Sequence, residues 1–409
     1  MTNIQAYTEG QKVSSQIEQE FSIRYLNLPI TKNNQLSLNF VGIIIKNDRL
    51  LILFPKHFPL QKNALLEDSQ LLIQVLRKIK KSRGLGEIEE VNTFPLESYL
   101  YVCEFFRKFG LYMEQERIIK PGYNGKINWK HTISKSNKVL NNGNIIFIPF
   151  MLNKKIDHSV LITTCMEEVL AHGYKNFGRF FNMGVKYSIN RNYFSDYQVK
   201  SVIKQLKLLK TQHFKDSTLK LIQSLIRYFK WVTSSGVEVH FLTSNFDNVW
   251  EEMIHHYLNN HFKGMNISTK PHQIIFDSSN SQAYNFIHKQ KTSVKQDATK
   301  GRTYLVEYDH IAYDEVNNYI YLMDAKYYED INGLNYKQFV YSHLILEEQT
   351  RYFTQSNNEN NKKNLVNGLI LPTEKPYFSK IHINRESLDG IYITEHYLNI
   401  REVMMDFIL

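Results

Sequence analysis

Residues 307–328, EYDHIAYDEVNNYIYLMDAKYY, contain two apolar-aromatic runs on either side of the polar segment DEVNN. Two such runs around a short turn predict a β-hairpin. One turn register places Asp309 opposite Asp324, and a turn centred one residue later places Asp309 opposite Lys326. Because strand side chains alternate between the two faces, both registers put these three residues on one face.

This face has the residue types that metal-dependent phosphodiester hydrolysis requires. Opposed carboxylates on neighbouring strands have Cβ atoms roughly 5 Å apart and repel each other, so one protonates unless a cation lies nearby. Magnesium removes the repulsion and needs few protein oxygens, because water fills its remaining positions. A lysine beside the metal can orient the attacking water and offset phosphate charge. On spacing alone, a structural ion pair between Lys326 and either aspartate is the more common arrangement.

The surrounding motifs favour the catalytic interpretation. The segment resembles the core of the PD-(D/E)xK nuclease superfamily, in which an acid on one strand precedes D-x-K on the next. DAKYY (324–328) is especially similar to the form in McrC-type restriction nucleases and in the LlaJI-type restriction endonuclease family. Tyr308 stands where proline is usual, and proline is not a ligand. GKINWKHTI (125–133) resembles a motif that precedes the nuclease in LlaJI-type subunits.

The resemblance also implies a set of site residues. FDNVWEEM (246–253) is similar to the acid-bearing helix before the core, and NYKQFVYSHL (335–344) to the glutamine-bearing helix after it. The implied catalytic residues are Asp309, Asp324, Lys326, Glu251 and Gln338. The implied ligands of Mg²⁺, for which Mn²⁺ can substitute, are Asp309, Asp324, Glu251 and the Ala325 carbonyl.

The order of helical and strand patterns predicts a mixed α/β (α+β) protein with a PD-(D/E)xK nuclease domain at residues 236–409. The break at residues 234–236 separates this domain from an N-terminal α+β region, 1–235, for partner docking and DNA positioning. That region divides into two expected subdomains, 1–120 and 121–235. Within the first, residues 36–54 predict two strands around a turn at Asn47 and Asp48.

The charge of the chain points to a nucleic-acid partner. Its 409 residues have a formal net charge of +10, which is typical of proteins that bind anions. Residues 197–215 contain five lysines and no acid, in a pattern that predicts an amphipathic helix. Lys200, Lys204 and Lys207 on its polar face are candidate contacts to DNA phosphates, and a solvated face is an equal alternative.

Several classes of protein are excluded or disfavoured. The two cysteines cannot form a disulfide framework or a zinc cluster. Apolar stretches are too short for a membrane span and no N-terminal signal is visible, so we expect a cytoplasmic protein with no membrane partner. The resemblance implies a bacterial protein that acts on DNA and has no small-molecule substrate. Glu252 and His255 form one E-x-x-H on a predicted helix, whereas a di-iron bundle needs a second.

The sequence has no G-x-x-x-x-G-K-[ST] loop, so it does not hydrolyse nucleotides by that route. McrC-like nucleases depend on a separate McrB-like AAA+ GTPase, which is often the subunit that reads the DNA. The resemblance implies such a partner here, with double-stranded DNA as the substrate. Two alternatives stay open: a non-catalytic DNA-binding or adaptor subunit, and a repair or phage-defence nuclease of the same fold outside restriction.

Overall fold

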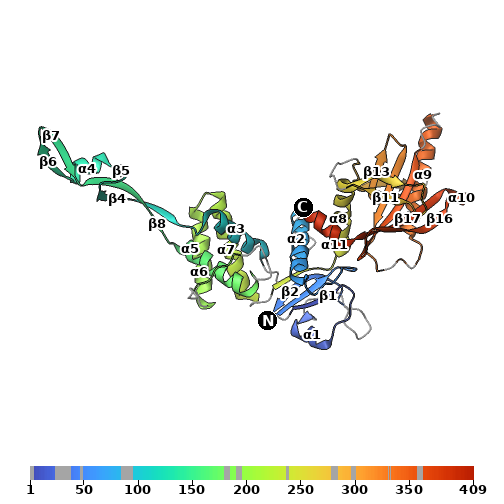
Figure 1. Ribbon diagram of the computed structural model, residues 1–409, viewed down its shortest axis with the longest axis horizontal. Helices are drawn as coiled ribbons and strands as arrows, with labels where there is room; N and C mark the ends of the chain where they lie inside the picture. The colour runs from blue at the N-terminus through green and yellow to red at the C-terminus, as the bar shows by residue number, and fades with distance from the viewer. Residues whose placement is uncertain are drawn as a thin grey trace. The chain divides into compact units, whose positions relative to one another are not determined.

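The structure is a computed structural model that describes residues 4–23, 38–46, 49–83, 95–178, 185–189, 196–235, 239–277, 284–295, 301–329, 331, 333–356 and 363–409. The chain groups into two compact units (Figure 1). One unit combines Met1–Val91 with Val239–Leu409, and the other is Asn92–Glu238. The expected boundary near residue 235 lies at a junction between the units, whereas the first 91 residues group with the expected nuclease region.

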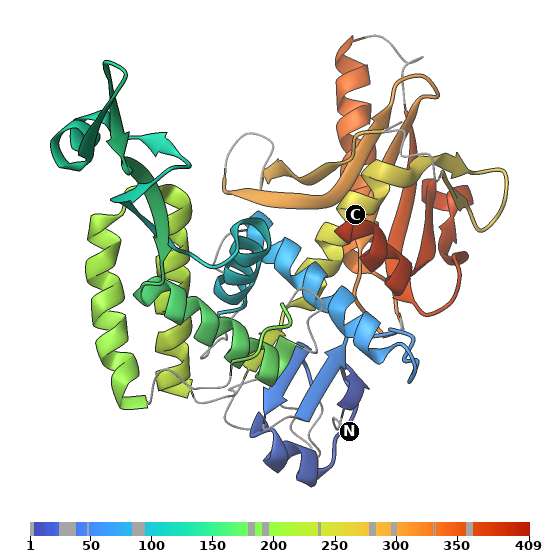
Figure 2. The same ribbon diagram turned by 60° about the vertical axis from the view of Figure 1, so that its left-hand side comes forward.

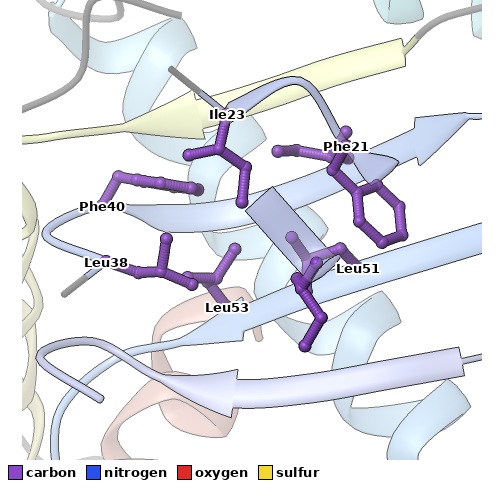
Figure 3. Close-up of a cluster of buried hydrophobic side chains, with 8 residues drawn as sticks. Phe21, Ile23, Leu38, Phe40, Leu51 and Leu53 are labelled. Atoms are coloured by element: carbon purple, nitrogen blue, oxygen red, sulfur yellow. The ribbon is translucent and has the colours of Figure 1, made fainter. Parts of the chain in front are cut away.

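The first unit contains a four-stranded sheet in the order β1 (Ile4–Thr8), β3 (Arg49–Phe54), β2 (Val41–Lys46) and β9 (Val239–Thr243). Continuous runs of Ile and Leu in β2 and β3 predict strands that are buried on both faces, and nearly all these side chains are buried. Helix α1 (Ser15–Glu20) contributes to a core that includes Phe21, Leu38, Phe40, Leu51 and Leu53 (Figure 3).

Strand pairing explains why the N-terminal residues belong with the C-terminal segment. β9 pairs antiparallel with β2, so Phe241 lies opposite Ile43 although about 200 residues separate them in sequence. Helix α2 (Leu65–Arg83) packs on β2 and on the C-terminal helix α11 (Ile400–Ile408) (Figure 2). Arg401 Nε donates to the buried Asp68 carboxylate at 2.9 Å. The expected turn at residues 47 and 48 lies outside the described residues.

The same unit holds a six-stranded mixed sheet. Its order is β12 (Ile287–Lys295), β13 (Thr303–Asp314), β14 (Tyr319–Ala325), β15 (Asn364–Thr373), β17 (Ile391–Asn399) and β16 (Phe378–Arg385). β14, β15 and β17 run parallel, and the outer pairs are antiparallel. The hairpin β10 (Phe262–Asn266) and β11 (Gln273–Phe276) and the short helix α10 (Glu386–Asp389) complete the unit. The mixed α/β class predicted from sequence is confirmed.

Two helices cover opposite faces of this sheet. Helix α9 (Tyr336–Ser356) packs Ile345 against Leu322. Helix α8 (Phe246–His261) lies on the other face, where His310 bonds to the Glu251 carbonyl. Leu322 pairs with Ile311, and His310 is the residue next to Ile311 on the same strand. Because side chains alternate along a strand, Leu322 and Ile311 face α9 whereas His310 faces α8.

The second unit combines helices with a projecting arm. The helices are α3 (Leu96–Phe109), α5 (Leu161–Gly173), the π-helical turn η2 (Tyr174–Gly178), α6 (Asp196–Gln212) and α7 (Asp216–Ser235). Residues 114–158, here called the arm, comprise β4 (Glu114–Gly122), β5 (Lys126–Ile127), α4 (Trp129–Lys135), β6 (Asn137–Asn141), β7 (Asn144–Ile148) and β8 (Phe150–His158) (Figure 1). Among the described residues, no helix is both long enough and apolar enough to cross a bilayer.

One local prediction within the arm is wrong. The sequence pattern of GKINWKHTI, with Ile127, Trp129 and Ile133 on one face, predicts a strand, but only Lys126 and Ile127 form one, and a helix begins at Trp129. The side chain of Asn128 accepts a hydrogen bond from the His131 backbone N–H at 3.2 Å, which caps this helix. The cap outweighs the alternating pattern of Ile127, Trp129 and Ile133, and the last two side chains are exposed.

Candidate active site

The hairpin has the register that places the two aspartates opposite each other. The ladder runs from Asp314 opposite Tyr319 to His310 opposite Met323, and Asp309 and Asp324 are the next residues in the same register. Asp314 fixes the turn, because its carboxylate accepts hydrogen bonds from the backbone N–H groups of Val316 at 3.1 Å and Asn317 at 2.8 Å.

The three residues singled out in the hairpin lie together. Asp309 and Asp324 are 4% and 1% exposed. Lys326 Nζ lies 2.6 Å from Asp324 Oδ2 and 3.9 Å from Asp309 Oδ2. The Lys326 backbone N–H donates to the Ile370 carbonyl at 2.8 Å, so the end of the β14–β15 ladder positions this lysine. The alternation of strand side chains therefore predicted the cluster correctly.

A second lysine, Lys337 on α9, completes the cluster and was not predicted. Its Nζ lies 3.3 Å from Asp309 Oδ1 and 3.9 Å from Asp324 Oδ1. The amine also lies 5.3 Å from the centroid of the Tyr341 ring, in a cation–π contact. The available signal was its position beside Gln338 and one turn before Tyr341, on the helix that was already expected to face the site.

The electrostatics of the two carboxyl groups are coupled. Burial, together with the hydrogen bond to Asp309 and its charge, raises the pKa of Asp324 to about 8. Burial also acts to raise the pKa of Asp309, but the hydrogen bond from Asp324 and the charges of Lys326 and Lys337 lower it below its usual value. Without a metal, the pair therefore retains one shared proton near neutral pH.

The donor set fits a divalent cation with few protein ligands. Both carboxylate oxygens of Asp324 are buried, and the amines of Lys326 and Lys337 lie 2.6 Å and 3.9 Å from them. Two such facing carboxylates are the oxygen ligands that Mg²⁺ prefers, with water and a phosphate oxygen filling the remaining positions. Within the described ranges, no group of three or more His, Cys, Asp or Glu side chains surrounds a metal position.

Gln338 is close to the site but bonds to the sheet instead of the carboxylates. It is fully buried, and its Nε2 contacts the carbonyls of Leu322 at 3.4 Å and Gly368 at 3.3 Å. It also contacts Asn367 Oδ1, and Asn367 in turn donates to Ser342 Oγ. These bonds hold α9 against β14 and β15, so Gln338 fixes the helix from which Lys337 extends. Its catalytic role stays a prediction.

The N-terminus of α9 has its own anchor. The Asn335 side chain caps the helix by accepting from the Gln338 backbone N–H at 3.0 Å. His382 Nε2 accepts from the Asn335 backbone N–H at 3.0 Å, and His382 Nδ1 lies 2.8 Å from Glu395 Oε1. A Glu–His pair can serve in catalysis, but here both ring nitrogens are used to hold a helix start. We assign this pair a structural role.

Glu251, the expected metal-side acid, forms an ion pair with Lys289 in which Nζ and Oε2 are 2.8 Å apart. Lys289 lies between the two β12 residues that pair with His310 and Tyr308, and so next to Asp309 across the sheet. Glu251 therefore stays near the site's strand, but its carboxylate is paired with a lysine instead of joining the aspartates. Its role as a ligand, like that of the Ala325 carbonyl, remains a prediction.

The residues after Lys326 attach the site to the N-terminal sheet. The buried Tyr327 donates its hydroxyl to Glu9 Oε2 at 2.7 Å and accepts from the Lys56 backbone N–H at 2.7 Å. His57 Nε2 bonds to the Tyr328 carbonyl at 3.1 Å. The residues around the N-terminal sheet thus contact the DAKYY segment directly, which sequence patterns had not indicated.

The predicted basic helix is confirmed as amphipathic. Helix α6 exposes Lys200, Lys204 and Lys207 and buries Val202 and Leu206. The exposed lysines are free of acidic neighbours along residues 197–215. Exposure alone does not distinguish a phosphate contact from a solvated face.

Comparison with known proteins identifies the class. The sequence profile described as LlaJI restriction endonuclease matches residues 40–358. The match spans most of the chain, and the protein therefore belongs to a family of restriction endonucleases. The family is the LlaJI restriction endonuclease family. No curated protein matches the chain.

Two solved structures show weak overall similarity. A half-complex from a tetradecameric assembly of Thermococcus gammatolerans McrB AAA+ hexamers with bound McrC is 10% identical, with a TM-score of 0.39, and the match covers 99% of this chain and 98% of that one. The cryo-EM structure of the Thermococcus gammatolerans McrBC complex is 11% identical, with a TM-score of 0.25, and covers 61% of this chain and 85% of that one. These scores are too low to assign a mechanism.

Proposed function

We propose that the protein is the DNA-cleaving subunit of a bacterial restriction system and hydrolyses phosphodiester bonds in double-stranded DNA with Mg²⁺ or Mn²⁺. The observation that carries the proposal is the pair of buried, opposed carboxylates, Asp309 and Asp324, with Lys326 beside them. Membership of a restriction endonuclease family supports the same conclusion. Such a system acts on DNA in the cytoplasm.

Each residue has a distinct task in this proposal. Asp309 and Asp324 hold the metal, which supplies Lewis-acid stabilisation of the phosphate and lowers the pKa of a water molecule. Lys326, fixed by the Ile370 carbonyl, orients the attacking water and offsets charge in the transition state. Gln338 keeps α9 against the sheet, and Lys200, Lys204 and Lys207 contact DNA phosphates.

We further propose that an AAA+ GTPase partner binds the arm. The sequence lacks a nucleotide-binding loop of its own, so another subunit must supply nucleotide hydrolysis. The far end of the arm exposes large apolar side chains, which in soluble proteins mark interaction sites. They are Tyr123, Trp129, Ile133, Leu140, Ile145 and Ile148.

Cleavage of double-stranded DNA by the purified protein and its partner, with Mg²⁺ and a nucleoside triphosphate, tests the proposal. We expect cleavage that stops in excess EDTA and little site-specific cleavage without the partner. Cutting that persists in EDTA would refute the two-carboxylate metal site. Site-specific cutting by the chain alone would refute the dependence on a partner.

A non-catalytic adaptor subunit is the competing proposal, and one observation favours it. Two lysines already neutralise the two aspartates, as in a closed structural ion-pair network. The adaptor proposal requires that Mn²⁺ does not bind at this pair and that the complex with the partner leaves DNA intact.

A further inference from the structure

The two lysines contact different oxygens of the carboxylate pair. Lys326 Nζ lies 2.6 Å and 3.9 Å from the Oδ2 atoms of Asp324 and Asp309. Lys337 Nζ lies 3.3 Å and 3.9 Å from the Oδ1 atoms of Asp309 and Asp324. Each carboxylate therefore has one oxygen near the strand lysine and the other near the helix lysine.

The two amines also differ in exposure. The Lys326 side chain is 11% exposed and follows a backbone that is bonded to β15. The Lys337 side chain is 45% exposed, so an ion arriving from solvent meets it first. In this same position the amine also contacts the Tyr341 ring, which lies at the exposed side of the cluster and is not a carboxylate partner. Lys337 is thus the amine that can move without disturbing the sheet.

Charge balance requires such a movement when a metal binds. Metal binding displaces the shared proton, and the two ionised carboxylates and two ammonium groups then sum to zero. A divalent cation would leave an excess of two positive charges beside buried groups, where like charges within about 4 Å repel strongly. Removal of one amine and arrival of a DNA phosphate would restore neutrality.

We propose that Lys337 is the exchangeable counter-ion of the carboxylate pair. It contacts Asp309 and Asp324 without metal, leaves them when a divalent cation binds, and then pairs with a phosphate of the DNA. Lys326 stays beside Asp324 in both states. This inference deepens the proposed nuclease function and rests on it.

A titration of the purified full-length chain with Mn²⁺, followed by the EPR signal of free Mn²⁺ without DNA or partner, tests the first half. Lys337→Met should bind Mn²⁺ at least about tenfold more tightly than the parent, because a positive charge beside the ligands has been removed. The control is Lys380→Met, since Lys380 is also an exposed lysine in cation–π contact, 5.1 Å from the Tyr397 ring centroid, but lies away from the aspartates. Its affinity should stay within about twofold of the parent.

A second variant protects the test against misfolding. Lys337→Gln removes the charge but keeps a side-chain donor within reach of Asp309, so it should also bind Mn²⁺ more tightly. If the methionine variant does not fold, the glutamine variant decides the outcome. Unchanged or weaker Mn²⁺ affinity in the folded variants would overturn the counter-ion role.

The phosphate half is tested by the salt dependence of duplex DNA binding, measured with and without Mn²⁺. The measured quantity is the slope of the logarithm of the DNA-binding constant against the logarithm of the salt concentration. Adding Mn²⁺ should steepen this slope for the parent protein by about one released counter-ion, and should not do so for Lys337→Gln. Equal slope changes in both proteins would mean that Lys337 does not pass to a phosphate.

The inference and the proposed function fail in different ways. If the parent neither binds Mn²⁺ nor cuts DNA with its partner, the nuclease proposal fails and Lys337 has no metal to exchange with. If the parent binds Mn²⁺ and cuts DNA, but both Lys337 variants bind Mn²⁺ no more tightly, only the counter-ion role fails.

Discussion

The two faces of the six-stranded sheet bury ionisable side chains in opposite ways. On the α9 face, Asp309 and Asp324 have lysine amines between 2.6 and 3.9 Å away, and one of these lysines is half exposed. On the α8 face, His310 is fully buried and stacks on the His288 ring with 5.2 Å between centroids. Burial, reinforced by the nearby His288, lowers the pKa of His310 to about 3, so it stays neutral.

A second histidine on the α8 face behaves like the first. His396 on β17 is fully buried beside Gly368 and Met323, and burial lowers its pKa to about 3. A neutral histidine fills space and bonds to its neighbours without a counter-charge. The carboxylates of the other face instead need cations, and the cation nearest to solvent can be replaced. The two faces thus compensate burial differently, with neutral histidines on one face and lysine-paired carboxyl groups on the other.

The largest expected effect is the loss of DNA cleavage when residues of the α9 face are changed. Asp324→Ala or Lys326→Ala should reduce DNA cleavage with the partner by at least about a hundredfold, the lower range for one positioned catalytic group. The thermal midpoint of unfolding should stay close to that of the parent, because Lys337 remains beside Asp309 in both variants. Cleavage rate and midpoint are measured on the same preparations.

The matched control for these variants is Lys291→Ala, which breaks an exposed lysine–carboxylate pair with Glu307 on the neighbouring strand, 3.7 Å apart. It should change neither quantity, because surface pairs contribute about 0–1 kcal/mol. A lowered midpoint with full cleavage in the folded fraction of Lys326→Ala would make the DAK segment a structural pair.

The cluster of Asp309, Asp324 and Lys326 was predictable because strand alternation is local and covers only 18 residues. Alternation does not choose the register. The Asp314 carboxylate does so, by bonding the N–H groups of the turn. That signal is also local, since aspartate is typical of such turns.

The positions of Lys337 and Glu251 could not be obtained in this way. The rotation of α9 depends on Gln338 bonding to two strands, and the carboxylate of Glu251 depends on Lys289 from a third strand. The pairing of β2 with β9 likewise joins segments about 200 residues apart. Such contacts depend on tertiary packing, which sequence periodicity does not encode.

The next effect concerns a buried histidine on the α8 face. His396→Gln should make the free energy of unfolding depend less on pH on the acidic side. The folded pKa of His396, about 3, lies below its ordinary value of 6.5, so protons bind preferentially to the unfolded chain. The contribution of neutral His396 to the free energy of unfolding is complete above pH 6.5 and is lost as the pH falls toward 3. In His396→Gln, the slope of the free energy of unfolding against pH should decrease by up to about 1.4 kcal/mol per pH unit.

Urea unfolding at several pH values between about 5 and 7.5 measures this slope. The groups that face His396 are Tyr377, whose hydroxyl lies 3.1 Å from Nδ1, and His272, whose charge acts in the same direction. Both are retained in the variant, so the change in slope belongs to His396. Parallel curves for the parent and His396→Gln would show that this histidine does not titrate on unfolding.

The smallest effect tests how closely the α8 face is packed. A Cβ at Gly368 would lie 2.7 Å from Met323 Sδ and 2.9 Å from His396 Cδ2, so Gly368→Ala must displace one of them. Overpacking of this kind costs about 1–3 kcal/mol. The control is Gly333→Ala, where an added Cβ meets no atom within 4 Å.

Urea unfolding should show the loss for Gly368→Ala but not for Gly333→Ala, and cleavage per folded molecule should stay within a few-fold of the parent. Met323 is the flexible neighbour, so Met323→Ala should relieve part of the strain, and the combined variant should lose less stability than the sum of the single changes. Additive losses would place the clash on the His396 ring instead. A hundredfold loss of cleavage in folded Gly368→Ala would contradict the separation of the two faces, because Gly368 also accepts a hydrogen bond from Gln338 and would then transmit the displacement to α9.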